Sequence, residues 1–371
     1  MCKTVVLFYL IISFSFFGIF ARTTNHLLTE DPPKIQGNVV LRFEMSPIGQ
    51  ILTNLCLGTP RQCFLFKIAT NINESFIFDS VLKSDGFESE HSSSLTVNTN
   101  IGEIFFEHAY STYEGLVAKD VLTIPESTVV LPEFTFFLVM KGESVPNYAG
   151  VLGLGKNYQD NEYSFLSMLY QNNYIQAQTF KISYASFENG GTLFFGYLDT
   201  TNPKKYKYCE VIGGTDDPTF DTTLDAIIYI NNNDSENVQV YHSPQKLFFS
   251  PGANKIYCPA KFFYFFVEKA FSEYINKNVL CHTEEEADLF ATVICSDLIL
   301  NKELGELRFV FGKWNVSISI SDLFVKCGDN EYCFEIVMAN EESKWVFGSP
   351  FLKKFPVFFD GDNSIIKLQM S

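Results

Sequence analysis

Residue types that carry catalysis occur in this 371-residue chain, but their spacing does not support most of that chemistry. The run from Gly150 to Asn157 comes close to a phosphate-binding loop, yet Asn157 stands where a Ser or Thr would hold magnesium. A Gly-x-Ser-x-Gly elbow is missing, and Gly348-Ser349-Pro350 lacks the second glycine. The sequence therefore argues against a nucleotide site and against a serine nucleophile.

The histidines and cysteines do not form a predicted metal site either. The five histidines show no ligand spacing with one another; they are His26, His91, His108, His242 and His282. Cys281 and His282 are adjacent in sequence, which is poor geometry for binding one metal ion. We therefore expect no metal and no other cofactor.

The strongest sequence pattern lies in two segments, each an apolar strand followed by a loop. Gly58-Thr59-Pro60 is followed by an apolar strand that ends in Ala69-Thr70-Asn71. This run resembles the first active-site segment of the pepsin-like aspartic proteases, where Gly-Thr-Pro-x-Gln-x-Phe precedes a strand ending in Asp-Thr-Gly-Ser. On that pattern Ala69 occupies the aspartate position, Thr70 keeps its residue type, and Asn71 replaces the glycine.

The second half of the chain contains a similar segment. The apolar strand 246–249 is followed by Ser250-Pro251-Gly252, and Gly252, Ile256 and Pro259 fall in step with the family's second loop. The resemblance therefore places Ser250 at the second aspartate position. Two aspartates near these loops fail on spacing. Asp79 lies ten residues too far from the Gly-Thr-Pro turn, and Asp221 lacks the downstream glycine and proline.

This pair of replacements bears directly on the chemistry that the resemblance implies. Aspartic proteolysis needs two carboxylates about a hydrogen bond apart, which share one proton and activate a water molecule. Ala69 offers no polar atom, and the hydroxyl of Ser250 is not acidic near neutral pH. The sequence thus predicts no catalytic residues and a pseudoenzyme.

Further segments extend the resemblance over residues 46–371. They follow in the family's order at 148–155, 190–199, 345–352 and 357–360. The implied fold is all-β, with a few short helices, in the bilobal pepsin-like arrangement. The fold also implies that Gly153 and Gly348 lie where crossing strands leave no room for a Cβ atom.

The resemblance also indicates a binding cleft, to which we assign Thr70, Phe76, His108 and Gly252. His108 falls at the position of the family's flap tyrosine, and Phe76 replaces the tryptophan that supports it. A slip of two residues would instead give the tyrosine role to Tyr110. The alternative for His108 is a surface histidine on a strand.

Composition supports a β-rich protein with few helices. Aromatic residues make up 16 % of the chain, and short apolar runs alternate with turn residues. Helices are predicted near 165–170 and 262–275. We place an N-terminal lobe at 46–200 and a C-terminal lobe at 201–371.

The first 45 residues read as targeting and leader segments. Residues 1–21 contain Lys3, an apolar stretch and a small residue at a plausible cleavage point, which predicts a secretory signal peptide. A membrane anchor is the alternative, although the stretch is short for one. Residues 22–45 are expected to form a short, lightly packed leader. The mature protein should be secreted or lumenal, lysosomal compartments included.

The cysteines fit that compartment, since eight of the nine remain after signal removal. Cys56 and Cys63 flank the Gly-Thr-Pro turn, so a cross-strand disulfide is possible there. The resemblance implies a Cys295–Cys333 bridge within the second lobe. Three pairings stay open for the remaining four, which are Cys209, Cys258, Cys281 and Cys327.

The chain is acidic and contains three glycosylation sequons. A net charge of −16 argues against nucleic-acid binding, because phosphates would be repelled. Asn73, Asn233 and Asn315 begin Asn-x-Ser sequons and are predicted glycosylation sites. For Asn73 the alternative is an unused sequon.

The best interpretation is a monomeric, non-proteolytic protein that binds a peptide or protein and has no membrane segment after signal removal. An active endopeptidase and a structural glycoprotein are the alternatives.

Overall fold

The computed structural model describes residues 39–369, apart from gaps at 47–48, 109–110, 126, 157–162, 186–189, 197–205, 211–218, 232–236, 242–243, 277–279, 287–289 and 340–343. The predicted signal peptide lies outside the described residues. Within the described residues, the strands form three sheets, of fourteen, nine and four strands. The β-rich architecture with two large sheets confirms the predicted fold class.

The fourteen-stranded sheet holds most of the first half of the chain and its last two strands. Its members are β1 (Val39–Met45), β2 (Ile51–Leu57), β3 (Gln62–Ala69), β4 (Phe76–Phe78), β5 (Thr96–Val97), β6 (Glu103–His108), β7 (Ser111–Thr123), β8 (Val130–Gly142), β9 (Gly150–Gly153), β10 (Thr179–Tyr184), β11 (Gly190–Phe195), β12 (Tyr206–Glu210), β26 (Val357–Asp360) and β27 (Ile365–Gln369).

The other two sheets come from the second half of the chain. The nine-stranded sheet contains β13 (Asp221–Leu224), β16 (Gln245–Phe249), β17 (Ile256–Pro259), β18 (Cys281–Glu286), β19 (Phe290–Ser296), β22 (Phe324–Lys326), β23 (Glu331–Phe334), β24 (Ile336–Ala339) and β25 (Lys344–Phe347). The four-stranded sheet contains β14 (Ala226–Ile230), β15 (Asn237–Tyr241), β20 (Glu306–Phe311) and β21 (Trp314–Ser319).

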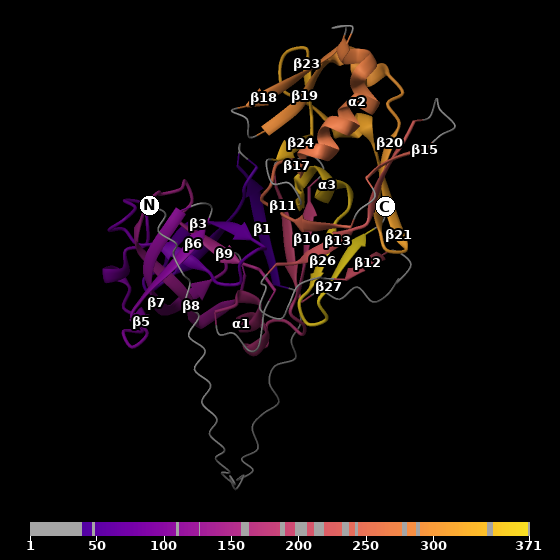
Figure 1. Ribbon diagram of the computed structural model, residues 1–371. Coiled ribbons are helices and arrows are strands. Elements are labelled where there is room, and N and C mark those ends of the chain that lie inside the picture. The colour runs from indigo at the N-terminus through magenta and orange to yellow at the C-terminus, as the bar shows by residue number, and fades with distance from the viewer. Residues whose placement is uncertain are drawn as a thin grey trace, which may run out of the picture. The chain divides into compact units, whose positions relative to one another are not determined.

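The expected boundary at residue 200 does not separate the sheets. β26 pairs antiparallel with β10, and β12 pairs with β27, so strands from the yellow end of the chain join the sheet that begins with β1 (Figure 1). Phe180 and Phe359 stack across this junction with ring centroids 4.6 Å apart. Buried aromatic side chains therefore tie the last strands to the first sheet.

The leader expected at 22–45 must be shortened, because its last seven residues form β1. Alternate residues of that strand, Val39, Leu41 and Phe43, are buried, and β1 pairs antiparallel with β11 along its length. This alternation is the period of a strand with one face in the core. Residues 39–45 are thus part of the packed sheet, and the prediction of a lightly packed segment is wrong there.

Three α-helices lie in the described part of the chain, and two of them match the predicted segments. The helix α1 (Phe165–Gln171) begins after Ser164, whose hydroxyl accepts a hydrogen bond from the N–H of Ser167. α2 spans Ala260–Asn276 and buries Phe262, Phe266 and other apolar residues at helical spacing. The third, α3 (Ser349–Lys354), follows β25. Across the described residues, none of the helices has the length and apolar character needed to cross a membrane.

Candidate functional site

The first loop of the site begins where β3 ends at Ala69. β3 runs parallel to β9, with Ala69 opposite Gly153, and the N–H of Leu154 donates to the carbonyl of Ala69 at 2.7 Å. Gly153 lies against the chain just after the loop. A Cβ atom there would stand 2.4 Å from the carbonyl oxygen of Glu74, so only glycine fits, as the sequence predicted.

The second loop repeats this arrangement at the end of β16. The N–H of Ser250 donates to the carbonyl of Phe347 at 3.0 Å, and the N–H of Ala253 donates back to the carbonyl of Ser250 at 3.0 Å. Gly348 lies against this turn. A Cβ atom on Gly348 would approach the carbonyl oxygen of Ala253 to 2.4 Å, which explains the second predicted glycine.

The two loops meet in the structure. The hydroxyl of Thr70 donates to the carbonyl of Phe249 at 3.2 Å, and Thr70 is buried. The open side of Gly252 faces the first loop, since a Cβ atom there would find only the carbonyl oxygen of Ile68, at 3.8 Å. Ala69 and Ser250 therefore stand at neighbouring positions, each one residue from the Thr70–Phe249 hydrogen bond.

Apolar and aromatic side chains surround Ala69. Ala69 is 4 % exposed and packs in a small cluster separate from the main core, which we call the Ala69 cluster; its buried members are Ala69, Phe76, Phe78, Tyr113, Val139, Tyr148 and Val151. Burial raises the pKa of Tyr148 above its usual range, which holds the phenol neutral. The methyl group of Ala69 thus faces side chains that offer no acid–base group near neutral pH.

The hairpin of β6 and β7 closes onto this cluster through Phe76. The Phe76 ring lies 5.1 Å from that of Phe106 and 6.0 Å from that of Tyr113, measured between centroids. His108 ends β6 opposite Ser111 in the backbone ladder. The hairpin tip, including the alternative flap residue Tyr110, lies outside the described residues. Phe76 therefore contacts both strands of the hairpin. Tyr113 is a cluster member that the sequence analysis missed.

Lys67 is a further residue of the site that the sequence analysis missed. It lies two positions before Ala69 on β3, and its Nζ atom stands 5.5 Å from the centre of the Tyr148 ring. Burial lowers the pKa of this lysine. Strand alternation could have identified it, because residues two apart on a strand share a face.

The two aspartates rejected on spacing are engaged elsewhere. Asp79 is buried, and its Oδ1 atom accepts a hydrogen bond from the N–H of Val81 at 2.8 Å. Asp221 lies on β13 and forms an ion pair with Lys246, near the start of β16. Asp79 and Asp221 therefore make structural contacts, Asp79 with a neighbouring residue and Asp221 with the strand that pairs with β13.

The chain after the first loop turns inward at Asn73. Asn73 is 5 % exposed, and its sequon therefore lies in the packed interior, which favours the alternative of an unused sequon. Burial raises the pKa of the neighbouring Glu74, while hydrogen bonds from the backbone N–H groups of Glu74 and Asn73 oppose this shift. Asn233 lies outside the described residues, and Asn315 is exposed on β21.

The disulfides correct one prediction and confirm another. Cys56 and Cys63 are joined across the β2–β3 turn, as the sequence suggested. The bridge expected between Cys295 and Cys333 is wrong. Cys295 pairs with Cys281, which stands directly opposite it in the β18–β19 ladder, and Cys333 pairs with Cys327.

Strand register explains the correction. In the β19–β23 ladder Cys295 stands opposite Tyr332, so Cys333 is one residue out of step. Neighbouring residues on a strand point to opposite faces, which directs the two sulfur atoms apart. Cys258 is a free, buried thiol. Cys209 lies on β12, and its side chain is outside the described residues.

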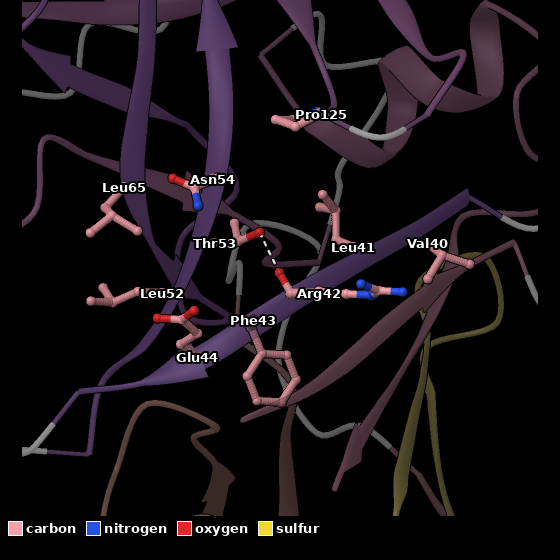
Figure 2. A pocket seen from close by; sticks show the side chains of 10 residues that line it. All are labelled: Val40, Leu41, Arg42, Phe43, Glu44, Leu52, Thr53, Asn54, Leu65 and Pro125. Atoms are coloured by element: carbon pink, nitrogen blue, oxygen red, sulfur yellow. Dashed lines mark hydrogen bonds between the residues drawn. The ribbon is translucent and has the colours of Figure 1, made fainter. Parts of the chain in front are cut away.

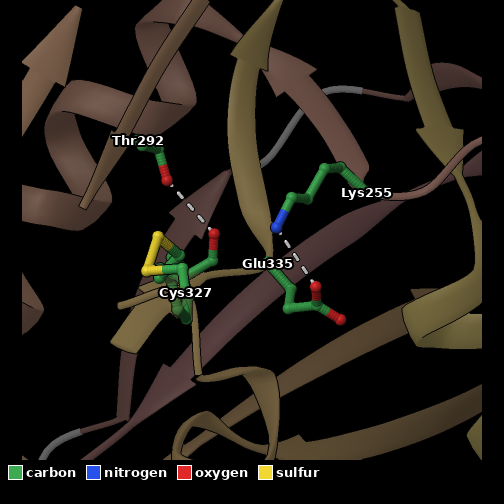
Figure 3. Close-up of a disulfide and its surroundings, with 6 residues drawn as sticks. Lys255, Thr292, Cys327 and Glu335 are labelled. Carbon is green, nitrogen blue, oxygen red and sulfur yellow. Dashed lines mark hydrogen bonds and ion pairs between the residues drawn. A yellow bond between two sulfur atoms is a disulfide. The ribbon is translucent and has the colours of Figure 1, made fainter. Parts of the chain in front are cut away.

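An ion pair lies near the Cys327–Cys333 disulfide (Figure 3). The Nζ atom of Lys255 stands 3.2 Å from Oε1 of Glu335, joining the second loop to the end of β23. Burial raises the pKa of Glu335, and the positive charge of Lys255 opposes that shift. The hydroxyl of Thr292 donates to the carbonyl of Phe334 at 3.2 Å.

A pocket of 480 Å³ opens on the face formed by β1, β2 and β3 (Figure 2). Its lining combines apolar and polar side chains from these strands with one residue from the turn after β7: Val40, Leu41, Arg42, Phe43, Glu44, Leu52, Thr53, Asn54, Leu65 and Pro125. Leu52 also packs against the Ala69 cluster. The side chain of Leu52 therefore contacts both the pocket and the Ala69 cluster.

One known protein family matches most of the chain. Residues 50–370 match the family model described as eukaryotic aspartyl protease. No curated protein matches closely enough to stand as a relative.

Proposed function

We propose that this chain, which belongs to the eukaryotic aspartyl protease family, does not cleave peptides and instead binds a peptide or protein. One observation carries the proposal. Ala69, at the position that the family pattern gives to the first aspartate, is packed with its methyl group in an apolar cluster. A water molecule activated for attack needs a carboxylate at this place.

The second loop supports the same conclusion. Ser250 supplies a hydroxyl group that cannot act as a base near neutral pH. The next residue, Pro251, is buried and has no backbone N–H to donate toward a carboxylate. The base, the acid and the water site would therefore be missing together.

The scaffold of the two loops is nevertheless intact. The Thr70–Phe249 hydrogen bond joins the loops, and Tyr184 adds a hydrogen bond to the carbonyl of Pro251 at 2.9 Å. Gly153 and Gly348 keep the crossing strands in close contact. A framework held in this way can position a ligand without chemistry, and we therefore favour binding over a purely structural role.

A hydrolysis assay tests the proposal. The purified secreted protein is expected to release no product from fluorogenic peptides from about pH 2 to about pH 7. Turnover that a statine-type inhibitor blocks in a homogeneous sample would establish the alternative, an active endopeptidase. The double variant Ala69→Asp with Ser250→Asp should also stay inactive, because Asn71 and Pro251 still alter the loops.

We further propose that the protein is secreted or lumenal and carries a glycan on Asn315. Three disulfides fit an oxidising compartment. Asn315 is exposed, whereas Asn73 is buried, so glycopeptide mass spectrometry of secreted material should find Asn315 modified and Asn73 unmodified. A glycan on Asn73 would mean that the chain after the first loop packs differently.

A further inference from the structure

Lys67 presents a positive charge beside the place where an active relative would carry its first carboxylate. Lys67 and Ala69 share one face of β3, since they are two residues apart on the strand. The side chain of Lys67 is half-buried. The charge at this end of the site is therefore opposite in sign to that of an ionised aspartate.

The Tyr148 ring holds the head group at this face. The Nζ atom of Lys67 lies 5.5 Å from the centre of the Tyr148 ring, within the range of a cation–π contact. Tyr148 is 3 % exposed and is fixed within the Ala69 cluster. A buried ring fixes the location of the ammonium group better than a solvent-exposed partner would.

Carboxylate partners of Lys67 are absent from the described part of the chain. Other lysines there do pair with acids, as Lys255 does with Glu335 and Lys367 with Asp360. The acid nearest by strand register is Glu44, which stands opposite Leu52, and Leu52 in turn stands opposite Lys67. Two strand spacings put Glu44 about 10 Å away between Cα atoms, with a leucine in between.

A partly buried ammonium group with no carboxylate partner among the described residues is costly, and an anionic ligand would offset that cost. We propose that Lys67 receives the side-chain carboxylate of an acidic residue in a bound peptide. This inference rests on the proposed binding function and names the ligand chemistry of the same site. A carboxylate placed at Lys67 would form a charge-assisted hydrogen bond in a half-buried setting, where such bonds are stronger than in water.

The adjoining pocket offers space for the rest of the peptide. Leu52, the cross-strand neighbour of Lys67, lines the pocket together with Leu65 and Val40 (Figure 2). Leu65 and Val40 are both exposed, so apolar area is available there for contact. The expected ligand is an extended peptide with a Glu or Asp next to apolar residues.

The test compares three octapeptide libraries that differ only in one fixed central residue, which is Glu, Gln or Lys; the remaining positions are a mixture of apolar and small polar residues. Peptides retained by the immobilised full-length secreted protein are quantified by mass spectrometry. We expect enrichment of the Glu library over the Gln library by about tenfold, because a bond between charged groups is replaced by a weaker one. The enrichment should fall as salt is added.

Variants assign the preference to Lys67. Lys67→Met keeps the packed stem but removes the charge, and it should reduce the Glu preference to near unity. Lys67→Glu should favour the Lys library instead. Lys344→Met is the matched control, since Lys344 is another half-buried lysine, with its Nζ atom 5.4 Å from the centre of the Phe248 ring. It should leave the preference unchanged, and thermal unfolding checks that each variant is folded.

The outcomes separate the two proposals. Peptide retention without a Glu preference, or a preference that survives Lys67→Met, overturns the role of Lys67 and leaves the binding function standing. Retention of none of the libraries by the folded wild-type protein overturns both. A Glu preference lost in Lys67→Met and kept in Lys344→Met supports both.

Discussion

The hydroxyl of Thr70 donates a hydrogen bond to the carbonyl of Phe249, 179 positions away in the sequence. This bond joins the residue after Ala69 to the residue before Ser250. It is the direct link between the two loops, and both of its ends lie in the interior. Its loss would leave a buried carbonyl without this donor, which costs more than the bond itself contributes.

Thr70→Val should therefore destabilise the protein by about 1–3 kcal/mol, since valine keeps the shape and removes the hydroxyl. Chemical denaturation measures the change in free energy of unfolding. Thr96→Val, at an exposed position on β5, is the control and should stay within about 0.5 kcal/mol of wild type. Equal effects of the two variants would argue that the loops are not held by this bond.

Gly153 and Gly252 differ in whether the surrounding structure leaves room for a Cβ atom. Gly153→Ala should cost about 2–4 kcal/mol, because its Cβ atom would stand 2.4 Å from a backbone oxygen that cannot rotate away. Gly252→Ala is the matched change in the other loop. Its Cβ atom would meet its nearest neighbour at 3.8 Å, so we expect stability within about 1 kcal/mol of wild type. Similar losses in both variants would contradict the close approach at Gly153.

The disulfide pattern makes a third prediction. Non-reducing peptide mapping should recover Cys281 joined to Cys295 and Cys327 joined to Cys333. Replacing both Cys281 and Cys295 by serine opens a bridge between residues 14 positions apart and should cost about 3 kcal/mol in the chain-entropy model. A peptide containing Cys295 linked to Cys333 would mean that the β19–β23 register is wrong.

Glu74 predicts a pH dependence of stability. Burial raises the pKa of Glu74 in the folded protein above its ordinary value of 4.5. Between these two values the folded state binds more protons than the unfolded state, so this group's stabilising contribution is present below pH 4.5 and is lost as pH rises through the raised value.

Glu74→Gln removes this titration. The variant should therefore gain stability relative to wild type as the pH rises from acid to neutral, measured by denaturation at several pH values. Glu133→Gln, at an exposed position on β8, controls for the loss of one negative charge. A stability difference between Glu74→Gln and wild type that falls with rising pH would have the opposite sign and would contradict the burial of this carboxylate.

Local sequence patterns determined much of the fold. Short motifs in the correct order identified the family, and helical spacing located α1 and α2. The position of Cys56 and Cys63 on either side of a turn suggested the bridge between them. Gly153 and Gly348 were identified within short local motifs, and the fold that those motifs imply leaves no room there for a Cβ atom. Each of these features depends on residues close in sequence or on one residue type.

Other features were decided by pairing between distant strands. The partner of Cys295 depends on the register of β18 and β23 against β19, and a shift of one residue turns a side chain to the other face. Residues 39–45 became a core strand because β11 was available to pair with them. The sequence shows Lys67 as a lysine on a predicted strand, but only the tertiary structure places its Nζ atom near the Tyr148 ring. Tyr148 lies 81 positions later in the chain, and the pairing of β3 with β9 brings the two residues together.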